Sequence, residues 1–346
     1  MKKLIAILLM VTLVLSLAIG CAKKEEAAAP TTSDAPAAEE KKITIKLGHV
    51  EAEDRSTHKA AVEFEKYVEQ QSEGKVDIEI YPNGQLGGDR QMTEAVALGT
   101  LHMTLPTTSV LTTYDPKFGV LDMPFLFKNE QAGFKALDNE IGAEFNEILE
   151  SVGIYNFGYN YNGARHMSNS KHPINEPKDL KGIKMRVQES PVFIDLFKSL
   201  GANPTPMSFG EVFTALQQGT VDGQENAASL VYAMKFHEAQ KYYSLTGHTY
   251  SFLAVMINDK FYKGLPQDIQ QIVADGAKKY LIDYQRDMEI NDDSVYMEKL
   301  KADGMQINEI TPENHEKFVE AVKPMYDKYK AEIGQDMFDL AVKYNQ

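Results

Sequence analysis

The fold of this chain is decided by LKGIKMRVQES at residues 180–190 and by SLGANPTPMSFGEVFTALQQGTVDGQEN at residues 199–226. In the first segment Ile183, Met185 and Val187 alternate with polar residues, and this period of two predicts a strand with one buried face. Arg186 belongs to the polar set. We therefore expect Arg186 to face away from the core, near the end of the strand.

A helix follows this strand in the sequence pattern. Pro191 opens a segment with apolar residues at helical spacing, and Gly201 closes it. In open α/β sheets, ligands bind at such strand-to-helix turns. The guanidinium of Arg186 is a rigid fork of donors that matches a carboxylate, so the pattern indicates carboxylate capture. A solvated arginine at a sheet edge fits the same pattern.

The N-terminal half of the chain predicts an α/β fold. Strand, helix and strand patterns at residues 43–47, 60–68 and 76–80 give a β-α-β opening. A second helix ends at Gly99, and a third strand follows at residues 101–105. This alternation of strands and helices predicts a mostly parallel sheet.

The C-terminal half predicts one unusually long helix. Apolar positions recur from Pro266 to about Ala302, which predicts a helix of up to ~37 residues, or ~55 Å at ~1.5 Å per residue. Gly276 lies inside it and weakens the case for an unbroken helix. Upstream, Ser208 and Glu211 form a capping-box pattern ahead of a shorter helix. The length of 346 residues predicts two domains.

Six spaced motifs make the chain similar to a known family. In chain order they are YPNGQLGGDRQM, LDMPFLF, YNGARHMSN, LKGIKMRV, SLGANPTPMSFGEVFTALQQGTVDGQEN and KYYSLTGH. Together they resemble the solute-binding proteins of TRAP transporters, the tripartite ATP-independent periplasmic systems, in the dicarboxylate-binding subunit family. The resemblance extends from about Ile43 to near the C-terminus.

The resemblance implies an α/β, two-domain fold like that of periplasmic binding proteins, with a hinged cleft and a long helix that spans both domains. The expected domain I is residues 43–162 plus about 252–291. The expected domain II is residues 163–251 plus about 292–346. The predicted helix at residues 266–302 is the candidate for the spanning helix.

The resemblance also implies a carboxylate site in domain II. Arg186 is expected to pair with the ligand carboxylate, and Asn226 to donate its side-chain amide to the same group. Phe209 is expected to form an apolar wall of the cleft, although a core position fits it equally well.

A second cation is implied by the motif YNGARHM, in which Asn162 and Gly163 predict a turn after the strand pattern at residues 154–161. The resemblance implies that Arg165 either contacts the ligand directly or lies just behind the residues that do. Glu225 and His248 are expected to hold it in place. An ordinary polar cluster at the domain junction is the alternative for these two partners.

In domain I the implied contacts are less specific. His49, His58, Arg90 and Thr107 lie near positions that touch ligand in relatives, but members of the family differ there. Thr107 stands where sialic-acid binders have an acidic residue, which argues against sialic acid. The residues that recognise the other end of the ligand therefore stay open.

The N-terminus predicts export from the cytoplasm. Two lysines precede an apolar run at residues 4–19, a pattern typical of a secretory signal peptide over residues 1–20. The run is shorter than the roughly 20 residues that span a bilayer, so a permanent membrane helix is the less favoured alternative.

The residues after the signal predict a lipid anchor and a tether. Cys21 is the only cysteine, and its place after Gly20 resembles a bacterial lipobox, which implies lipidation. Ala18 departs from that pattern, because lipoproteins usually have leucine there. Residues 21–42 are rich in alanine, proline and charge, which predicts a disordered tether.

Composition and motifs exclude several classes of function. The net charge of -14 disfavours binding to nucleic acids or to anionic membrane surfaces. The segment GQLGGD lacks the spacing of a dinucleotide-binding turn, and His237 lacks the second histidine of a zinc-protease helix. The sequence thus predicts no cofactor, no metal and no enzyme activity.

These inferences predict an extracytoplasmic, lipid-anchored receptor. It would capture an organic acid, with C4-dicarboxylates and uronate-like sugar acids as the first candidates, and deliver it to the membrane subunits of a TRAP transporter. A monomer is the expected state. An extracytoplasmic enzyme acting on sugar acids and a receptor for a membrane sensor are the alternatives.

Overall fold

Residues 42–346 are the part of the chain that the computed structural model describes. The predicted signal peptide, the predicted lipidation at Cys21 and all of the predicted tether except Lys42 lie outside these residues.

The first half of the described chain begins with the predicted β-α-β unit. Its elements are β1 (Ile43–Gly48), α1 (Ser56–Gln71), β2 (Val76–Tyr81), α2 (Asp89–Leu98), β3 (Met103–Thr104), α3 (Glu130–Leu137), α4 (Glu140–Ser151) and β4 (Ile154–Asn169). β1 pairs in parallel with β2 and with β3, which confirms the prediction for this part. Gly99 ends α2 with a left-handed φ of 76°, as its position in the sequence predicts.

The second half contains the strand and helix predicted around Arg186. Its elements are β5 (Lys184–Val187), α5 (Pro191–Ser199), β6 (Asn203–Pro206), α6 (Val212–Gln217), β7 (Gly223–Asn226), α7 (Ala228–Ala233), β8 (Tyr242–Asn258), α8 (Asp259–Lys263), α9 (Gln267–Gly276), α10 (Gln285–Ala302), β9 (Gln306–Glu309), α11 (Pro312–Ile333) and α12 (Gln335–Lys343). The capping box predicted at Ser208 is wrong, because its side chain makes no capping hydrogen bond and a short 3₁₀ turn, Phe209–Glu211, precedes α6.

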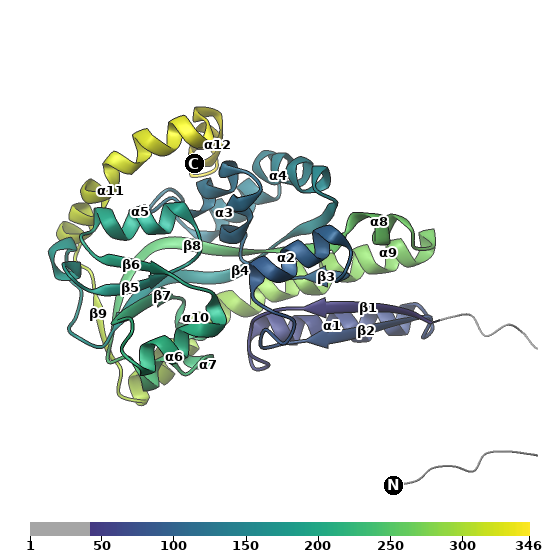
Figure 1. Cartoon of the computed structure of the whole chain (residues 1–346), viewed down its shortest axis with the longest axis horizontal. Helices are drawn as coiled ribbons and strands as arrows, with labels where there is room; N and C mark the ends of the chain where they lie inside the picture. Colours follow the sequence, from purple (N-terminus) through teal and green to yellow (C-terminus); the bar gives the residue numbers. More distant parts are fainter. Residues whose placement is uncertain (1–41) are drawn as a thin grey trace, which may run out of the picture. The chain divides into compact units, whose positions relative to one another are not determined.

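One mixed sheet joins all the strands. Its order is β2-β1-β3-β8-β4-β7-β5-β6, and β9 pairs with β8. Figure 1 shows β1 and β2 at one end and β5 and β6 at the other, with the long strands β4 and β8 running between them. The prediction of a mostly parallel sheet is wrong for the centre, because β4 and β8 are antiparallel to each other and β8 is antiparallel to β3.

The turn predicted at Asn162 and Gly163 is also wrong. β4 continues without a break through both residues, because β8 is long enough to pair with it on either side. The register between the two strands shifts at this point, so Asn162 and Gly163 form an irregularity of the bulge type. Gly163 has a φ of 94°, and a Cβ there would lie 2.3 Å from Cβ of Ala227. A tightly packed bulge therefore takes the place of the predicted turn.

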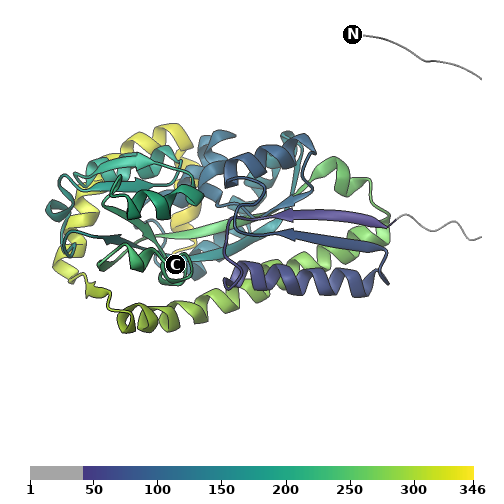
Figure 2. The same ribbon diagram turned by 60° about the horizontal axis from the view of Figure 1, so that its bottom comes forward.

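The predicted long helix is present over residues 267–302. It consists of α9, a π-helical stretch Ala277–Tyr284, and α10, with helical dihedral angles at both junctions. Figures 1 and 2 show this helix running from the end of the molecule near α1 to the end near α7. Gly276 is tolerated because α9 approaches α1 closely there, and a Cβ would lie 2.8 Å from the ring of Tyr67.

Candidate ligand-binding cavity

A cavity of about 450 Å³, part of it open to solvent, lies where the ends of several strands meet. The walls come from the β1–α1 loop, the start of α2, the segment after β3, the bulge of β4, the ends of β5 and β7, and parts of α7 and β8. The lining residues are Val50, Glu51, Asp89, Thr107, Val110, Asn162, Arg165, Arg186, Gln188, Glu189, Phe209, Asn226, Leu230 and Leu253. Strand ends of α/β sheets are the usual location for ligands.

Arg186 lines this cavity from β5. Its Nε and Nη2 both donate to the carbonyl of Met207, at 3.1 and 2.7 Å, and its guanidinium carbon lies 5.9 Å from the ring centre of Phe209. Only 3% of the residue is exposed. The side chain of Arg186 faces away from the core, as expected, but it faces a cavity and not bulk solvent. Burial lowers the pKa of Arg186 to about 10.

No carboxylate of residues 42–346 forms an ion pair with Arg186. The chain has five arginines, and three of them form such pairs. Arg55 pairs with Glu51 and Glu289, Arg165 with Glu225, and Arg286 with Asp138. Arg186 is the buried arginine whose charge the described residues leave without an ion pair.

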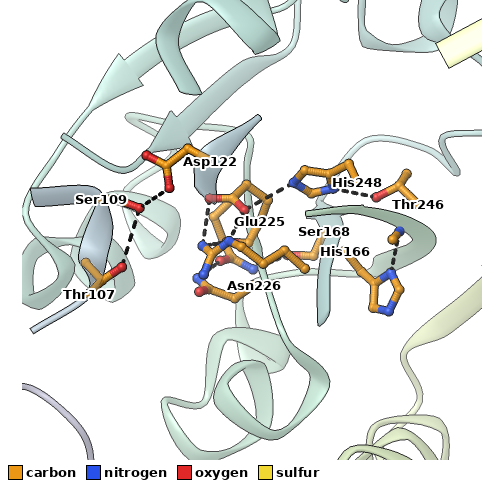
Figure 3. Close-up of polar contacts among 12 residues, drawn as sticks. Thr107, Ser109, Asp122, His166, Ser168, Glu225, Asn226, Thr246 and His248 are labelled. Atoms are coloured by element: carbon orange, nitrogen blue, oxygen red, sulfur yellow. Dashed lines mark hydrogen bonds and ion pairs between the residues drawn. The ribbon is translucent and has the colours of Figure 1, made fainter. Parts of the chain in front are cut away.

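Arg165 and Glu225 form a closed pair beside Arg186. Nε and Nη2 of Arg165 both donate to the carboxylate of Glu225, and Nη2 also donates to the carbonyl of Glu225 at 2.6 Å. Nε2 of His248 lies 3.3 Å from the same carboxylate, and Nδ1 of His248 lies 2.8 Å from Oγ1 of Thr246. Figure 3 shows Glu225, His248 and Thr246 in this order.

The environment of this network shifts the pKa values of Glu225 and His248. Burial would raise the pKa of Glu225, but the charge of Arg165 and the hydrogen bond from His248 hold that pKa at about 2. Burial lowers the pKa of His248. Arg165, Glu225 and His248 are thus brought together in one buried cluster, while their part in binding a ligand stays a prediction.

Five of the seven residues predicted to bind ligand line the cavity. They are Arg165, Arg186, Phe209, Asn226 and Thr107. Nδ2 of Asn226 donates to Oε1 of Gln224, and Oγ1 of Thr107 lies 3.5 Å from Oγ of Ser109 (Figure 3).

The other two predicted residues, His49 and Arg90, do not line this cavity. Nε2 of His49 lies 3.1 Å from Nδ1 of His58, and burial lowers the pKa of His49 to about 3. Arg90 lines a neighbouring cavity, which shares only Glu189 with this one. Contact of His49 or Arg90 with a ligand stays a prediction that requires a rearrangement of the cavity.

Several polar residues of the cavity were not predicted from the sequence. Asp89 and Gln188 each have a buried side-chain atom, Oδ1 and Nε2, with no hydrogen-bond partner in residues 42–346. Burial raises the pKa of Asp89 to about 7, even though its Oδ2 accepts a hydrogen bond from the amide of Thr107 at 3.3 Å. Gln188 could have been found, because it stands two residues after Arg186 and therefore on the same face of the chain.

Another group missed in the sequence lies around Arg55. Its Nε donates to Glu51 at 2.7 Å, Nη1 donates to Glu289 at 3.0 Å, and Nη2 donates to Oδ1 of Asn162 at 2.9 Å. Glu51 and Asn162 line the cavity, whereas Glu289 lies on α10 of the long helix. The cluster therefore connects one cavity wall to that helix. No local sequence pattern indicates this cluster, because Arg55 and Glu289 are 234 positions apart.

Residues 42–346 contain neither a metal-binding cluster nor a membrane-spanning helix. No three His, Cys, Asp or Glu side chains are grouped so that they could hold a metal ion. None of the helices in this part of the chain is both long and apolar enough to cross a membrane.

The fold and the cavity define a two-domain α/β binding protein, in which segments far apart in the sequence surround one site. The chain belongs to the family described as bacterial extracellular solute-binding protein, family 7, which matches residues 47–332. This membership confirms the resemblance to the solute-binding proteins of TRAP transporters and an extracytoplasmic location.

Individual relatives agree with this assignment. A solute-binding protein of Verminephrobacter eiseniae is 38% identical over 272 residues, which cover 79% of this chain and 80% of the relative. The crystal structure of the sugar acid binding protein DctPAm from Advenella mimigardefordensis, in complex with galactonate, has a TM-score of 0.86 and 34% identity over 88% of this chain and 98% of that one.

A second solved structure carries a different ligand. The TRAP periplasmic solute-binding protein from Sulfurospirillum deleyianum, with bound succinate, has a TM-score of 0.83 and 33% identity over 87% of this chain and 98% of that one. The family therefore includes similar proteins with a sugar acid and with a dicarboxylate.

Proposed function

We propose that this chain is a receptor that captures an organic acid through Arg186 and delivers it to a TRAP membrane transporter. The observation that carries the proposal is the buried guanidinium of Arg186, which faces a cavity and has no ion pair with residues 42–346. A buried charge without a partner costs several kcal/mol. A ligand carboxylate would supply the missing partner and form charge-assisted hydrogen bonds with it.

The neighbouring residues would complete the carboxylate site. We propose that Asn226 and Phe209 contact the ligand beside Arg186, and that Arg165 adds positive potential from behind its pair with Glu225. Because Glu225 already accepts two hydrogen bonds from Arg165, the ligand would meet Arg186 as its principal partner.

Closure of the two domains would follow ligand binding. Under the proposed boundaries, Val50 and Thr107 belong to domain I, whereas Arg186 and Asn226 belong to domain II, and all four line the cavity. A ligand that contacts both sets would favour the closed state by its differential contacts. The transporter would then recognise that closed state.

We further propose that the receptor binds its ligand without chemical change, as a monomer, and that a lipid on Cys21 holds it at the membrane. The family membership supports a binding role. Mass spectrometry of the intact protein from membranes checks the anchor, since lipidation requires a mass above that of the chain cleaved before Cys21. An unmodified N-terminal cysteine would contradict it.

Titration calorimetry of Arg186→Ala tests the capture mechanism. With an acid that binds the wild-type protein, we expect affinity to fall by at least about 100-fold, because the carboxylate would be desolvated without a partner. Lys184→Ala is the matched control. Lys184 lies on the same strand, is exposed and donates to the carbonyl of Gly219, so its loss should change affinity by less than about twofold. An unchanged dissociation constant for Arg186→Ala would contradict the proposal.

A further inference from the structure

The charges that line the cavity can neutralise only one carboxylate. Arg165 and Arg186 supply the positive charge of the lining, but Arg165 is already neutralised by Glu225. Arg186 alone is left for the ligand. Arg90, which also forms no ion pair with a described residue, lines the neighbouring cavity, and the two cavities share only Glu189.

The rest of the lining carries excess negative charge. Glu51 is paired with Arg55, but Arg55 also serves Glu289, so two carboxylates share one guanidinium. Asp89 and Glu189 line the cavity as well, and neither forms an ion pair with a described residue. These charges are close enough to interact, because Glu51 and Glu189 add to the effect of burial in raising the pKa of Asp89, whereas the charge of Arg186 lowers it.

Two buried atoms of the lining lack hydrogen-bond partners within residues 42–346. They are Oδ1 of Asp89, an acceptor when ionised, and Nε2 of Gln188, a donor. Gln188 is only 6% exposed. A hydroxyl group can donate to the first and accept from the second, because it has one donor proton and two lone pairs. A carboxylate can only accept, so above about pH 7, where Asp89 is ionised, it would leave Oδ1 of Asp89 without a donor.

A second carboxylate would also be repelled. It would enter a space bordered by Glu51, Asp89 and Glu189, whose described lining has no cation besides Arg165 and Arg186. Juxtaposed like charges at a desolvated site lower affinity by orders of magnitude. A hydroxyl group carries no charge and avoids this loss.

We propose that the ligand is a hydroxylated monocarboxylate of the sugar-acid class, with its carboxylate on Arg186 and a hydroxyl group between Asp89 and Gln188. The same lining disfavours C4-dicarboxylates. This inference rests on the proposed capture of an acid by Arg186 and names the chemical class of that acid.

The test uses two acids of equal carbon number, D-erythronate and succinate. D-erythronate has a hydroxymethyl group in place of the second carboxylate of succinate and carries two further hydroxyl groups on C2 and C3. Titration calorimetry of the protein expressed from its full sequence should give an affinity for D-erythronate, or for the longer acid galactonate, at least about 100-fold above that for succinate. Erythritol, the neutral analogue, should not bind. Equal or tighter binding of succinate would overturn the inference and leave acid capture intact.

Two variants test whether the negative charges of the lining determine the preference for a sugar acid over succinate. Glu51→Gln and Asp89→Asn each remove one negative charge from the lining, and Arg55 keeps Glu289 as a partner in the first variant. In each, the ratio of sugar-acid to succinate affinity should fall at least about tenfold, by weaker binding of the sugar acid, stronger binding of succinate, or both. Glu53→Gln, an exposed change two residues after Glu51, should leave the ratio within about twofold.

The outcomes distinguish this inference from the proposed function. An unchanged ratio in both Glu51→Gln and Asp89→Asn would overturn the assignment of the sugar-acid class. If erythritol binds as tightly as D-erythronate, or if no acid of the panel binds, capture through Arg186 itself is overturned.

Discussion

Two buried arginines on the same sheet, Arg165 and Arg186, differ in whether a carboxylate of the chain pairs with them. Arg165 on β4 and Arg186 on β5 are both almost fully buried, and each guanidinium lies within 6 Å of a phenylalanine ring. Arg165 has a carboxylate partner, whereas among residues 42–346 the hydrogen-bond partner of Arg186 is the carbonyl of Met207. The folded chain thus neutralises the charge of Arg165 with its own carboxylate. In our proposal, the charge of Arg186 is neutralised by the carboxylate of the ligand.

The largest expected effect concerns stability. Arg165→Ala should lower the free energy of unfolding by about 3–5 kcal/mol, because it removes the guanidinium that neutralises buried Glu225 and leaves His248 as its remaining partner. Arg186→Ala should leave it unchanged or raise it, because the variant removes a buried charge without an ion pair and loses only the hydrogen bonds to the carbonyl of Met207. Chemical denaturation of both variants without ligand measures the difference. Equal losses would mean that the two arginines are equivalent in the folded chain.

A smaller effect separates the charge of Arg186 from its shape. Arg186→Lys keeps the charge but loses the planar fork, so affinity for a bound acid should fall by roughly 10- to 100-fold, less than in Arg186→Ala. Titration calorimetry checks this order. If the lysine variant binds like wild type, a point charge suffices and bidentate recognition is wrong.

A third comparison is a pair of opposite pH dependences of stability. The pKa of Glu225 is depressed to about 2, so its contribution is fully present above the ordinary pKa of a glutamate and is lost as the pH falls toward 2. The pKa of Asp89 is raised to about 7, so the folded state holds a proton that the unfolded state has lost. Between about pH 4 and pH 7 this makes stability fall as the pH rises.

The stability of wild type relative to Glu225→Gln should therefore increase with pH up to about pH 4.5. Relative to Asp89→Asn, it should decrease from about pH 4 to pH 7 and then level off. Urea denaturation across this range measures both differences. Slopes of the same sign would show that the two carboxyl groups do not have opposite environments.

The bulge in β4 shows why part of the candidate site could not be predicted. Asn and Gly in sequence are typical of a turn, and only the length of β8 shows that the strand continues through Asn162 and Gly163. Because β4 continues, Arg165 lies within this strand, opposite Thr249 of β8. The neighbouring strand on the other side is β7, which contains Glu225. Gln188, in contrast, was predictable, because it shares the face of Arg186 at a spacing of two.

The sequence by itself determined part of the secondary structure and the family. The β-α-β opening, the helix after Arg186 and the helix at residues 267–302 follow from periodicities within short segments, and the family follows from motifs in a fixed order. Only the tertiary structure decided which charges are paired. Arg55 meets Glu289 across 234 positions, and Arg165 meets Glu225 across 60. Ion pairs depend on distance in space, which a local pattern does not contain, so the buried arginine without a carboxylate could be identified only in the folded chain.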